Sequence, residues 1–210
     1  RYLPGEKGSV GGDWYDVFRL PEGRIGMVIG DVVGRGLPAA LVMGRLRSAL
    51  RAYAIETSDP ADTLERLDRK AHHFEADQMT TILYGVLELS TGRMELSSAG
   101  HPLPVLALPE VEAVSIGGRA DPPLGVLPLV TRHRIAVEIP PGASLCMFTD
   151  GMVERRNVPL DDNIDRLRKV VTATHPDVVC RSVLAAMLDD EATLDDVAVL
   201  VVRRTQLAFD

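Results

Sequence analysis

The order of strand-like and helix-like segments constrains the fold of this chain more than any other feature of its sequence. Strand patterns at 13–20 and 24–33, separated by a turn at 21–23, predict a β-hairpin, and the patterns at 80–89 and 93–99 predict a second one. Between the hairpins lie two helical segments, 39–56 and 60–76. Strand patterns then follow at 103–108, 111–116, 130–139 and 143–149, before helices at 160–173 and 178–188 and a closing strand at 197–204.

Strands that come in runs and helices that come in pairs are typical of α+β proteins with antiparallel sheets, not of the alternating pattern of a doubly wound fold. About nine strands are more than one sheet of ordinary size holds. We therefore predict two packed antiparallel sheets with helices on the outside. The apolar stripes of the first two helices should face a sheet; they contain Val42, Leu46, Ala49, Leu50 and Tyr53, and then Ala61, Leu64, Leu67, Ala71 and Phe74.

Composition narrows the class of protein. The 210 residues are 46% hydrophobic and 25% charged, which fits a single globular domain over 1–210. A net charge of −7 argues against a nucleic-acid or membrane surface, and no apolar run approaches the ~20 residues of a bilayer span. Two isolated cysteines, Cys146 and Cys180, fit a reducing, cytoplasmic compartment. Because the chain begins at Arg1 without a signal peptide, we expect it to be part of a longer regulatory protein.

A glycine motif follows the first hairpin. Gly34, Gly36 and Ala39 match the G-x-G-x-x-A pattern of dinucleotide-binding folds, and the motif lies between a strand and a helix. That pattern also needs a second parallel strand ending in an acid, and Asp31 just before the glycines would repel a pyrophosphate. The glycines therefore indicate a sharp backbone turn rather than a nucleotide site.

Acidic residues mark the tips of four strand patterns. Asp13 follows two glycines, Asp31 ends an apolar strand, Asp150 ends another, and the pair Asp195-Asp196 precedes the last one. Carboxylates that converge on one point repel each other, and a hard divalent cation such as Mg²⁺ or Mn²⁺ removes that cost. Each aspartate taken alone is explained equally well as a turn former or helix cap. The four together favour a metal site.

Other catalytic signals are weak. His72 and His73 should lie on a solvated helix face, and His101 is either a site residue or a residue that structures its loop. The sequence contains no G-x-S-x-G or H-E-x-x-H motif and no P-loop. The chemistry therefore should not depend on an enzyme nucleophile.

Six stretches of the chain, taken in order, resemble the SpoIIE/RsbU-type bacterial serine phosphatases of the PPM (type 2C) family. They are Val10-Gly11-Gly12-Asp13-Trp14-Tyr15-Asp16, the run from Gly30 to Ala40, Ala99-Gly100-His101-Pro102, Pro123-Leu124-Gly125, the run from Phe148 to Glu154, and Asp195-Asp196-Val197. The resemblance covers nearly the whole chain and implies an αββα sandwich of two antiparallel sheets flanked by helices.

The resemblance also implies a site of two Mn²⁺ or Mg²⁺ ions. Its ligands would be Asp13, Asp31 as the bridge between the ions, the Val32 carbonyl and Asp150, with Asp195 ranked ahead of Asp196 in the adjacent pair. Two such ions activate a water molecule and neutralise the phosphoryl oxygens. The phosphate-binding arginine of eukaryotic relatives has no counterpart at a matching position, which leaves phosphate recognition to the metals.

The function implied is hydrolysis of phosphoserine or phosphothreonine on a protein. In the bacterial group the substrate is a phosphorylated STAS-type anti-sigma-factor antagonist, and a sensor domain or regulator acts through helices 39–56 and 60–76. The alternative is a catalytically inactive PPM-like domain that only binds partners. Such a domain usually loses metal ligands, whereas every matched position here is still aspartate.

Overall fold

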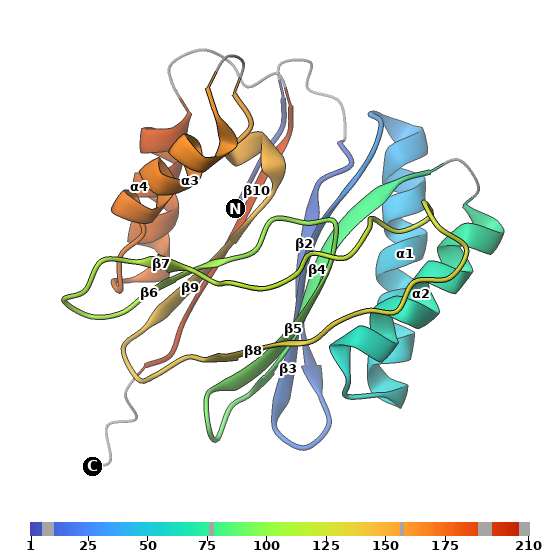
Figure 1. Cartoon of the computed structure of the whole chain (residues 1–210), viewed down its shortest axis with the longest axis horizontal. Coiled ribbons are helices and arrows are strands. Elements are labelled where there is room, and N and C mark those ends of the chain that lie inside the picture. The colour runs from blue at the N-terminus through green and yellow to red at the C-terminus, as the bar shows by residue number, and fades with distance from the viewer. Residues whose placement is uncertain (6–10, 76–77, 156–157, 189–194, 206–210) are drawn as a thin grey trace.

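Two five-stranded antiparallel sheets lie face to face, and a pair of helices covers the outer side of each sheet (Figure 1). The computed structural model describes residues 1–5, 11–75, 78–155, 158–188 and 195–205. The predicted α+β class and the αββα order of layers are confirmed.

The first sheet has the strand order β2-β3-β4-β5-β8. The two predicted hairpins form its first four strands. Trp14 pairs with Gly30 across the first hairpin, and Leu87 pairs with Met94 across the second. Its strands are β2 (Trp14–Leu20), β3 (Arg24–Val32), β4 (Thr80–Glu88), β5 (Arg93–Ala99) and β8 (Ile135–Glu138). The helices on its outer side are α1 (Leu37–Glu56) and α2 (Pro60–Phe74).

The second sheet has the order β1-β10-β9-β6-β7. Its strands are β1 (Tyr2–Leu3), β10 (Val197–Arg203), β9 (Ser144–Phe148), β6 (Val105–Ala107) and β7 (Val114–Ser115). A short 3₁₀ turn, η1 (Asp150–Met152), follows β9, and the covering helices are α3 (Leu160–Val170) and α4 (Pro176–Met187). The sequence did not predict β1, which pairs with β10 at the edge of this sheet.

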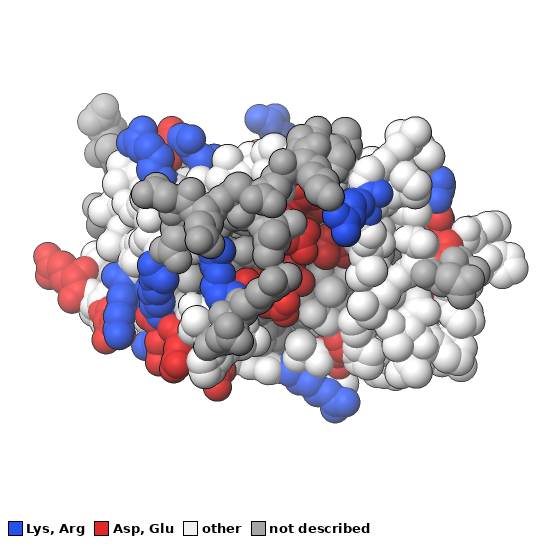
Figure 2. Space-filling model, turned by 90° about the horizontal axis from the view of Figure 1, so that it is seen from above, with Lys and Arg blue, Asp and Glu red and all other residues white. Residues whose placement is uncertain are grey.

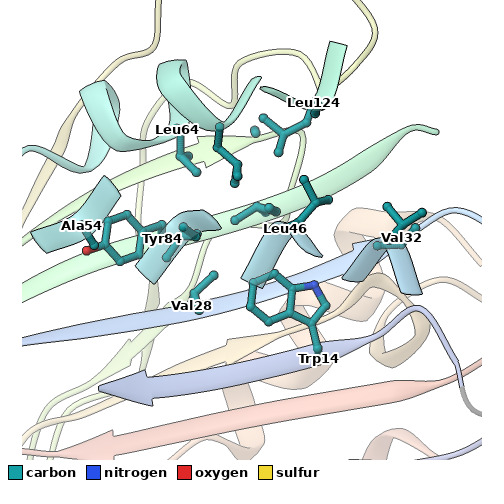
Figure 3. Packing of buried hydrophobic residues seen from close by; sticks show 14 of the residues in the cluster. Trp14, Val28, Val32, Leu46, Ala54, Leu64, Tyr84 and Leu124 are labelled. Carbon is teal, nitrogen blue, oxygen red and sulfur yellow. The ribbon is translucent and has the colours of Figure 1, made fainter. Parts of the chain in front are cut away.

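Apolar side chains fill all three interfaces between the layers. Leu46 of α1 and Leu64 of α2 pack with Val28 and Tyr84 of the first sheet (Figure 3). A second cluster joins α3 and α4 to the other sheet, and a third lies between the two sheets. Since each sheet buries both faces, its central strands are apolar almost throughout; β9 is buried at every position.

The strand predicted over 130–139 is shorter, with only Ile135–Glu138 paired to β5. The reason is that the preceding backbone donates to side chains instead of to a neighbouring strand. The Arg132 N–H donates to Glu65, and the His133 N–H donates to Asp121. The strand predicted over 111–116 is likewise reduced to Val114–Ser115.

The apolar stripe of α2 is confirmed except at its last member. Ala61, Leu64, Leu67 and Ala71 are buried, whereas Phe74 is 70% exposed at the end of the helix. The helix was expected to reach 76, but it ends at Phe74, and 76–77 lie outside the described residues. His72 and His73 are exposed as predicted. None of the helices in the described ranges is both long and apolar enough to cross a membrane.

Candidate metal centre

The predicted acidic residues lie at one end of the sandwich. Asp13 precedes β2, Asp31 is the penultimate residue of β3, Asp150 begins η1 directly after β9, and Asp195-Asp196 precede β10. In each antiparallel pair the start of one strand lies beside the end of its partner, so the acids of each sheet lie together. We call the end of the sandwich that carries these acids its acidic edge. Figure 2 shows acidic side chains gathered near the middle of this face.

Gly12 leaves room for oxygen atoms beside β3. A Cβ atom at this position would lie 2.1 Å from the Val32 carbonyl oxygen and 2.8 Å from Asp31 Oδ1. The Val32 N–H donates to the Gly12 carbonyl at 3.3 Å, which holds the two segments together. The glycine thus keeps a carbonyl oxygen and a carboxylate oxygen facing the same small space.

Gly11 and Gly151 allow the second sheet to approach in the same way. A Cβ at Gly11 would coincide with the Asp196 carboxylate, at 1.1 Å from Oδ2, and one at Gly151 would lie 2.3 Å from the Asp196 carbonyl oxygen. Any side chain at either glycine would push the loop before β10 away from the loops that carry Asp13 and Asp150. Close contact between the segments that carry Asp13, Asp150 and Asp196 therefore requires glycine at these two positions.

Asp13 is the most deeply placed of the acids, with 6% of its surface exposed. Its Oδ2 is buried and has no hydrogen-bond partner among the described residues. Burial raises the pKa of Asp13 well above its usual value, and the nearby charge of Asp31 raises it further. A buried carboxylate oxygen without a donor is costly unless a proton or a cation satisfies it.

The electrostatic contacts of Asp31 extend across both sheets. Burial raises its pKa, and the negative charges of Asp150 and Asp195 on the other sheet raise it further. Burial likewise raises the pKa of Asp150; the Gly151 N–H, 2.9 Å from Oδ1, opposes this shift, and the charge of Asp195 adds to it. The carboxylates of these acids therefore repel one another across the two sheets, which separate turn-forming residues would not do.

The two adjacent acids before β10 have different surroundings. Asp196 is buried, and its Oδ1 accepts a hydrogen bond from the Gly5 N–H at 2.8 Å. Burial raises the pKa of the nearby Tyr2 phenol, and the charge of Asp196 raises it further. Asp195 is exposed, and its Oδ1 accepts from the Asp196 N–H at 2.9 Å. Beyond the effect of burial, both charges raise the pKa of Asp31, but only that of Asp195 is found to act on Asp150 as well, and only the Asp196 carboxylate is buried against Gly5.

The donor set is the kind that Mg²⁺ or Mn²⁺ takes, since it consists of carboxylate oxygens and one backbone carbonyl. The space over Gly12 and the unpartnered Asp13 Oδ2 both fit a hard cation. Within the described ranges, no three Asp, Glu, His or Cys side chains already surround one point as metal ligands would. The residues fit such an ion after their side chains turn toward it.

Sequence reasoning missed two residues that support these loops. Thr149, fully buried, accepts a hydrogen bond from the Ala198 N–H at 2.8 Å and so ties the loop of Asp150 to β10. The Tyr2 hydroxyl accepts from the Gly11 N–H at 3.3 Å. The position of Thr149 directly before the predicted ligand Asp150 could have identified it. Nothing in the sequence near Tyr2 pointed to the site.

The glycine motif after β3 has the structural role predicted for it. Gly34 and Gly36 have φ values of 120° and 74°, which favour glycine, and Pro38 stands in the first turn of α1. Since β2, β3 and β4 are antiparallel, the motif lacks the parallel strand of a dinucleotide fold.

This two-sheet fold matches that of solved PPM phosphatases. The model of the family described as Stage II sporulation protein E (SpoIIE) matches residues 21–205, and the chain belongs to this family. Protein IcfG of Synechocystis sp. is 28% identical over 93% of the chain and 36% of its own length. Phosphoserine phosphatase RsbP of Bacillus subtilis is 25% identical over 70% of the chain and 37% of its own length. The chain thus spans little more than a third of these relatives.

Solved structures share the fold. The RsbU and RsbW domains of Rv1364c from Mycobacterium tuberculosis superpose with a TM-score of 0.83 and 29% identity, over 97% of this chain and 59% of that one. RsbX, solved in complex with magnesium, has a TM-score of 0.69 at 18% identity, over 96% of this chain and 91% of that one. At that identity, RsbX supports the fold alone.

Proposed function

We propose that this chain is a metal-dependent phosphatase that hydrolyses phosphoserine or phosphothreonine on a protein. The observation that carries the proposal is the space over Gly12, where the Val32 carbonyl and Asp31 face the same point at the edge where both sheets place their acids. Membership of the SpoIIE family and the printed name of RsbP, a phosphoserine phosphatase, support it.

The ligands we assign are Asp13, Asp31, Asp150, Asp195 and the Val32 carbonyl, for two Mg²⁺ or Mn²⁺ ions. Such ions supply an activated water molecule and neutralise charge on phosphoryl oxygens. We place Asp195 before Asp196 because the Asp196 carboxylate is buried against the Gly5 N–H, whereas Asp195 is exposed. Asp31 would be the ligand shared by the two ions, as the resemblance implies, and the charges of Asp150 and Asp195 on the other sheet already act on its carboxylate.

The protein's own part is to hold these oxygens in place while they repel one another. The hydrogen bond from Val32 to Gly12 fixes the end of β3 against the loop of Asp13, and the bond from Ala198 to Thr149 fixes the loop of Asp150. The attacking group would be water, so the chain needs no nucleophile. This agrees with an edge built from acids and glycines.

We propose a phosphorylated STAS-type anti-sigma-factor antagonist as the substrate, and an attached sensor domain or regulator that acts through α1 and α2. The similarity to RsbP and to a chain that joins RsbU and RsbW domains supports this assignment. The link from α1 to the site is short, since only 33–36 separate Val32 from the first residue of the helix.

A phosphoester assay with and without Mn²⁺ tests the proposal, first on a generic aryl phosphate and then on a phosphorylated STAS protein. We expect activity that needs Mn²⁺ and falls by at least about a hundred-fold in Asp150→Asn, because that change removes a negative ligand. Asp165→Asn on exposed α3 is the matched control and should stay fully active. Activity without metal, or in Asp150→Asn, contradicts the assignment. A folded but inactive parent would instead indicate an interaction domain.

A further inference from the structure

His101 lies between the two sheets and forms a hydrogen bond with each of them. It follows β5 and is 1% exposed. Its Nδ1 lies 2.9 Å from Thr81 Oγ1 on β4, and its Nε2 lies 3.0 Å from the carbonyl oxygen of Phe148 on β9. The Ser98 hydroxyl fixes its backbone, accepting from the His101 N–H and donating to its carbonyl.

These partners determine where the ring carries its proton. A backbone carbonyl can only accept, so Nε2 must carry the hydrogen and donate to Phe148. Nδ1 is then the acceptor, and the Thr81 hydroxyl donates to it. Burial lowers the pKa of His101 to about 3, so the ring stays neutral with this single arrangement of bonds.

Both bonds end next to residues of the acidic edge. Thr81 is the register partner of Asp31 in the β3–β4 ladder. Phe148 is the last residue of β9, two positions before Asp150. The imidazole therefore connects the strand pair that carries Asp31 to the strand that carries Asp150.

Most of the contact between the sheets cannot define their position so closely. It consists of apolar side chains such as Ile29, Leu83 and Met147, whose packing has no preferred direction. At the far end of the sandwich, Arg204 donates to the carbonyls of Thr91 and Ile139. At the acidic end, a rigid ring with two directional bonds sets the separation.

We propose that His101 is a positioning residue that fixes the distance between the two halves of the metal centre. This inference rests on the proposed function, since it assumes that Asp31 and Asp150 hold ions together. Loss of either ring bond lets the sheets shift, so the acids meet a cation with the wrong spacing. The effect is on metal affinity, beyond any effect on stability.

Thr81→Val tests the inference, because it removes the hydroxyl donor and keeps the shape of the side chain. Calorimetric titration with Mn²⁺ should give a dissociation constant about ten-fold higher than that of the parent, the size seen when groups that orient metal ligands are lost. Thr81→Ser keeps the hydroxyl, so its dissociation constant should lie within about two-fold of the parent value. The midpoint of Mn²⁺ activation in the aryl phosphate assay should move by the same factor.

Thr63→Val is the matched control. Thr63 is buried in the first turn of α2, and its hydroxyl donates to the carbonyl of Asp59, the N-cap of the same helix, at 3.0 Å. Both valine variants should lower the melting temperature, but only Thr81→Val should change Mn²⁺ affinity. Equal affinity in both valine variants overturns the role of His101 and leaves the proposed function intact. A parent that binds no Mn²⁺ and hydrolyses no phosphoester overturns the proposed function itself.

Nitrogen NMR of the ring keeps the inference testable if Thr81→Val does not fold. The parent should show His101 with Nε2 protonated and Nδ1 bare from pH 5 to 8. Titration with diamagnetic Mg²⁺ should shift both ring signals, because the bonded strands carry the ligands. Ring signals that report the other tautomer, or that do not respond to Mg²⁺, overturn the inference.

Discussion

The two helical layers are attached to their sheets in different ways. In the layer of α1 and α2, buried carboxylates meet basic side chains. Asp16 of β2 accepts from Arg47 and Arg51 and so joins α1 to the first sheet, while Glu75 at the end of α2 accepts from Arg45 and Lys70 and so joins the two helices to each other. On the other side, α3 and α4 bury mainly apolar side chains such as Leu167, Val179 and Val183. Among the described residues, no acidic side chain of α3 or α4 is buried.

Apolar burial and buried ion pairs have different effects on how a helix lies on its sheet. Apolar contacts hold a helix against a sheet but allow it to shift, whereas an ion pair with two hydrogen bonds has one preferred geometry. The layer with the buried ion pairs is the one joined to Asp31 and Val32 through 33–36. A defined position of α1 therefore means a defined position for the end of β3.

The largest effect is expected at the buried pair of Asp68 and Arg132, which fastens α2 to the segment before β8. The two charged groups are 2.6 Å apart, with side-chain exposures of 6% and 0%. Arg132→Met leaves the Asp68 carboxylate buried with the Gly125 N–H as its remaining donor, and should lower the free energy of unfolding by about 3–5 kcal/mol in urea titration.

The matched change in the other layer is Asp165→Asn, which breaks the surface pair with Arg168 on α3. Since that carboxylate is 60% exposed, its loss should cost less than about 1 kcal/mol. Equal costs for the two variants would show that the buried pair contributes no more to stability than a surface pair within one helix.

A second comparison uses two leucines that are both fully buried, Leu46 of α1 and Leu167 of α3. Leu→Ala should cost about 2–5 kcal/mol at either position, because each leaves a cavity of similar size. Only Leu46→Ala should also raise the Mn²⁺ concentration needed for half-maximal activity, since α1 leads directly to the site. An unchanged Mn²⁺ requirement in Leu46→Ala would show that this stripe is core and takes no part in control.

The elements with local signals were predictable from the sequence. Turn residues and alternating patterns marked both hairpins, and Pro60 with an Asp59 cap marked the start of α2. The segment before β8 was not predictable in this way. Its backbone donors reach Glu65, 67 residues away, and Asp121, so no local pattern describes them.

The same division holds for the site. Strand tips next to a glycine or to another acid pointed to Asp13, Asp31, Asp150 and the pair 195–196 from the sequence alone. The surroundings of the pair depend on Gly5 and Tyr2, about 190 residues away, and these could not be inferred. The bonds of His101 to Thr81 and Phe148 likewise exist only once the two sheets have met.

Acid pH should weaken the first layer selectively. Hydrogen bonds from Arg45 and then Lys70 lower the pKa of Glu75 to about 2, although its burial opposes this. A depressed folded pKa means that the carboxylate stabilises the fold fully above its ordinary value of 4.5 and loses this contribution as the pH falls toward 2.

Glu75→Gln therefore should destabilise the protein at pH 7, by about 1–3 kcal/mol, the range for charged hydrogen bonds. The difference in unfolding free energy between parent and variant should shrink as the pH is lowered from 4.5. Asp165→Asn, which removes a surface carboxylate, is the control measured over the same range. A difference between parent and Glu75→Gln that stays constant with pH would contradict the assignment of this contact as an ion pair.

The smallest effect concerns the backbone of α1 itself. Gly44 lies in the middle of the helix and is exposed, and a Cβ there would meet nothing within 4 Å. Gly44→Ala should therefore stabilise the protein by about 0.5–1 kcal/mol, because alanine loses less backbone entropy in a helix.

Gly23 in the β2–β3 turn offers the matched control, since it has equally open space but a φ of 69°. The same substitution at Gly23 should destabilise by roughly 1 kcal/mol, because a left-handed backbone disfavours a Cβ. Opposite signs in urea titration, with Mn²⁺ affinity unchanged in both variants, would show that the contacts of α1 and not its intrinsic stiffness set the position of β3. A Mn²⁺ affinity that follows Gly44→Ala would contradict that view, since this change touches no side-chain contact between α1 and the sheet.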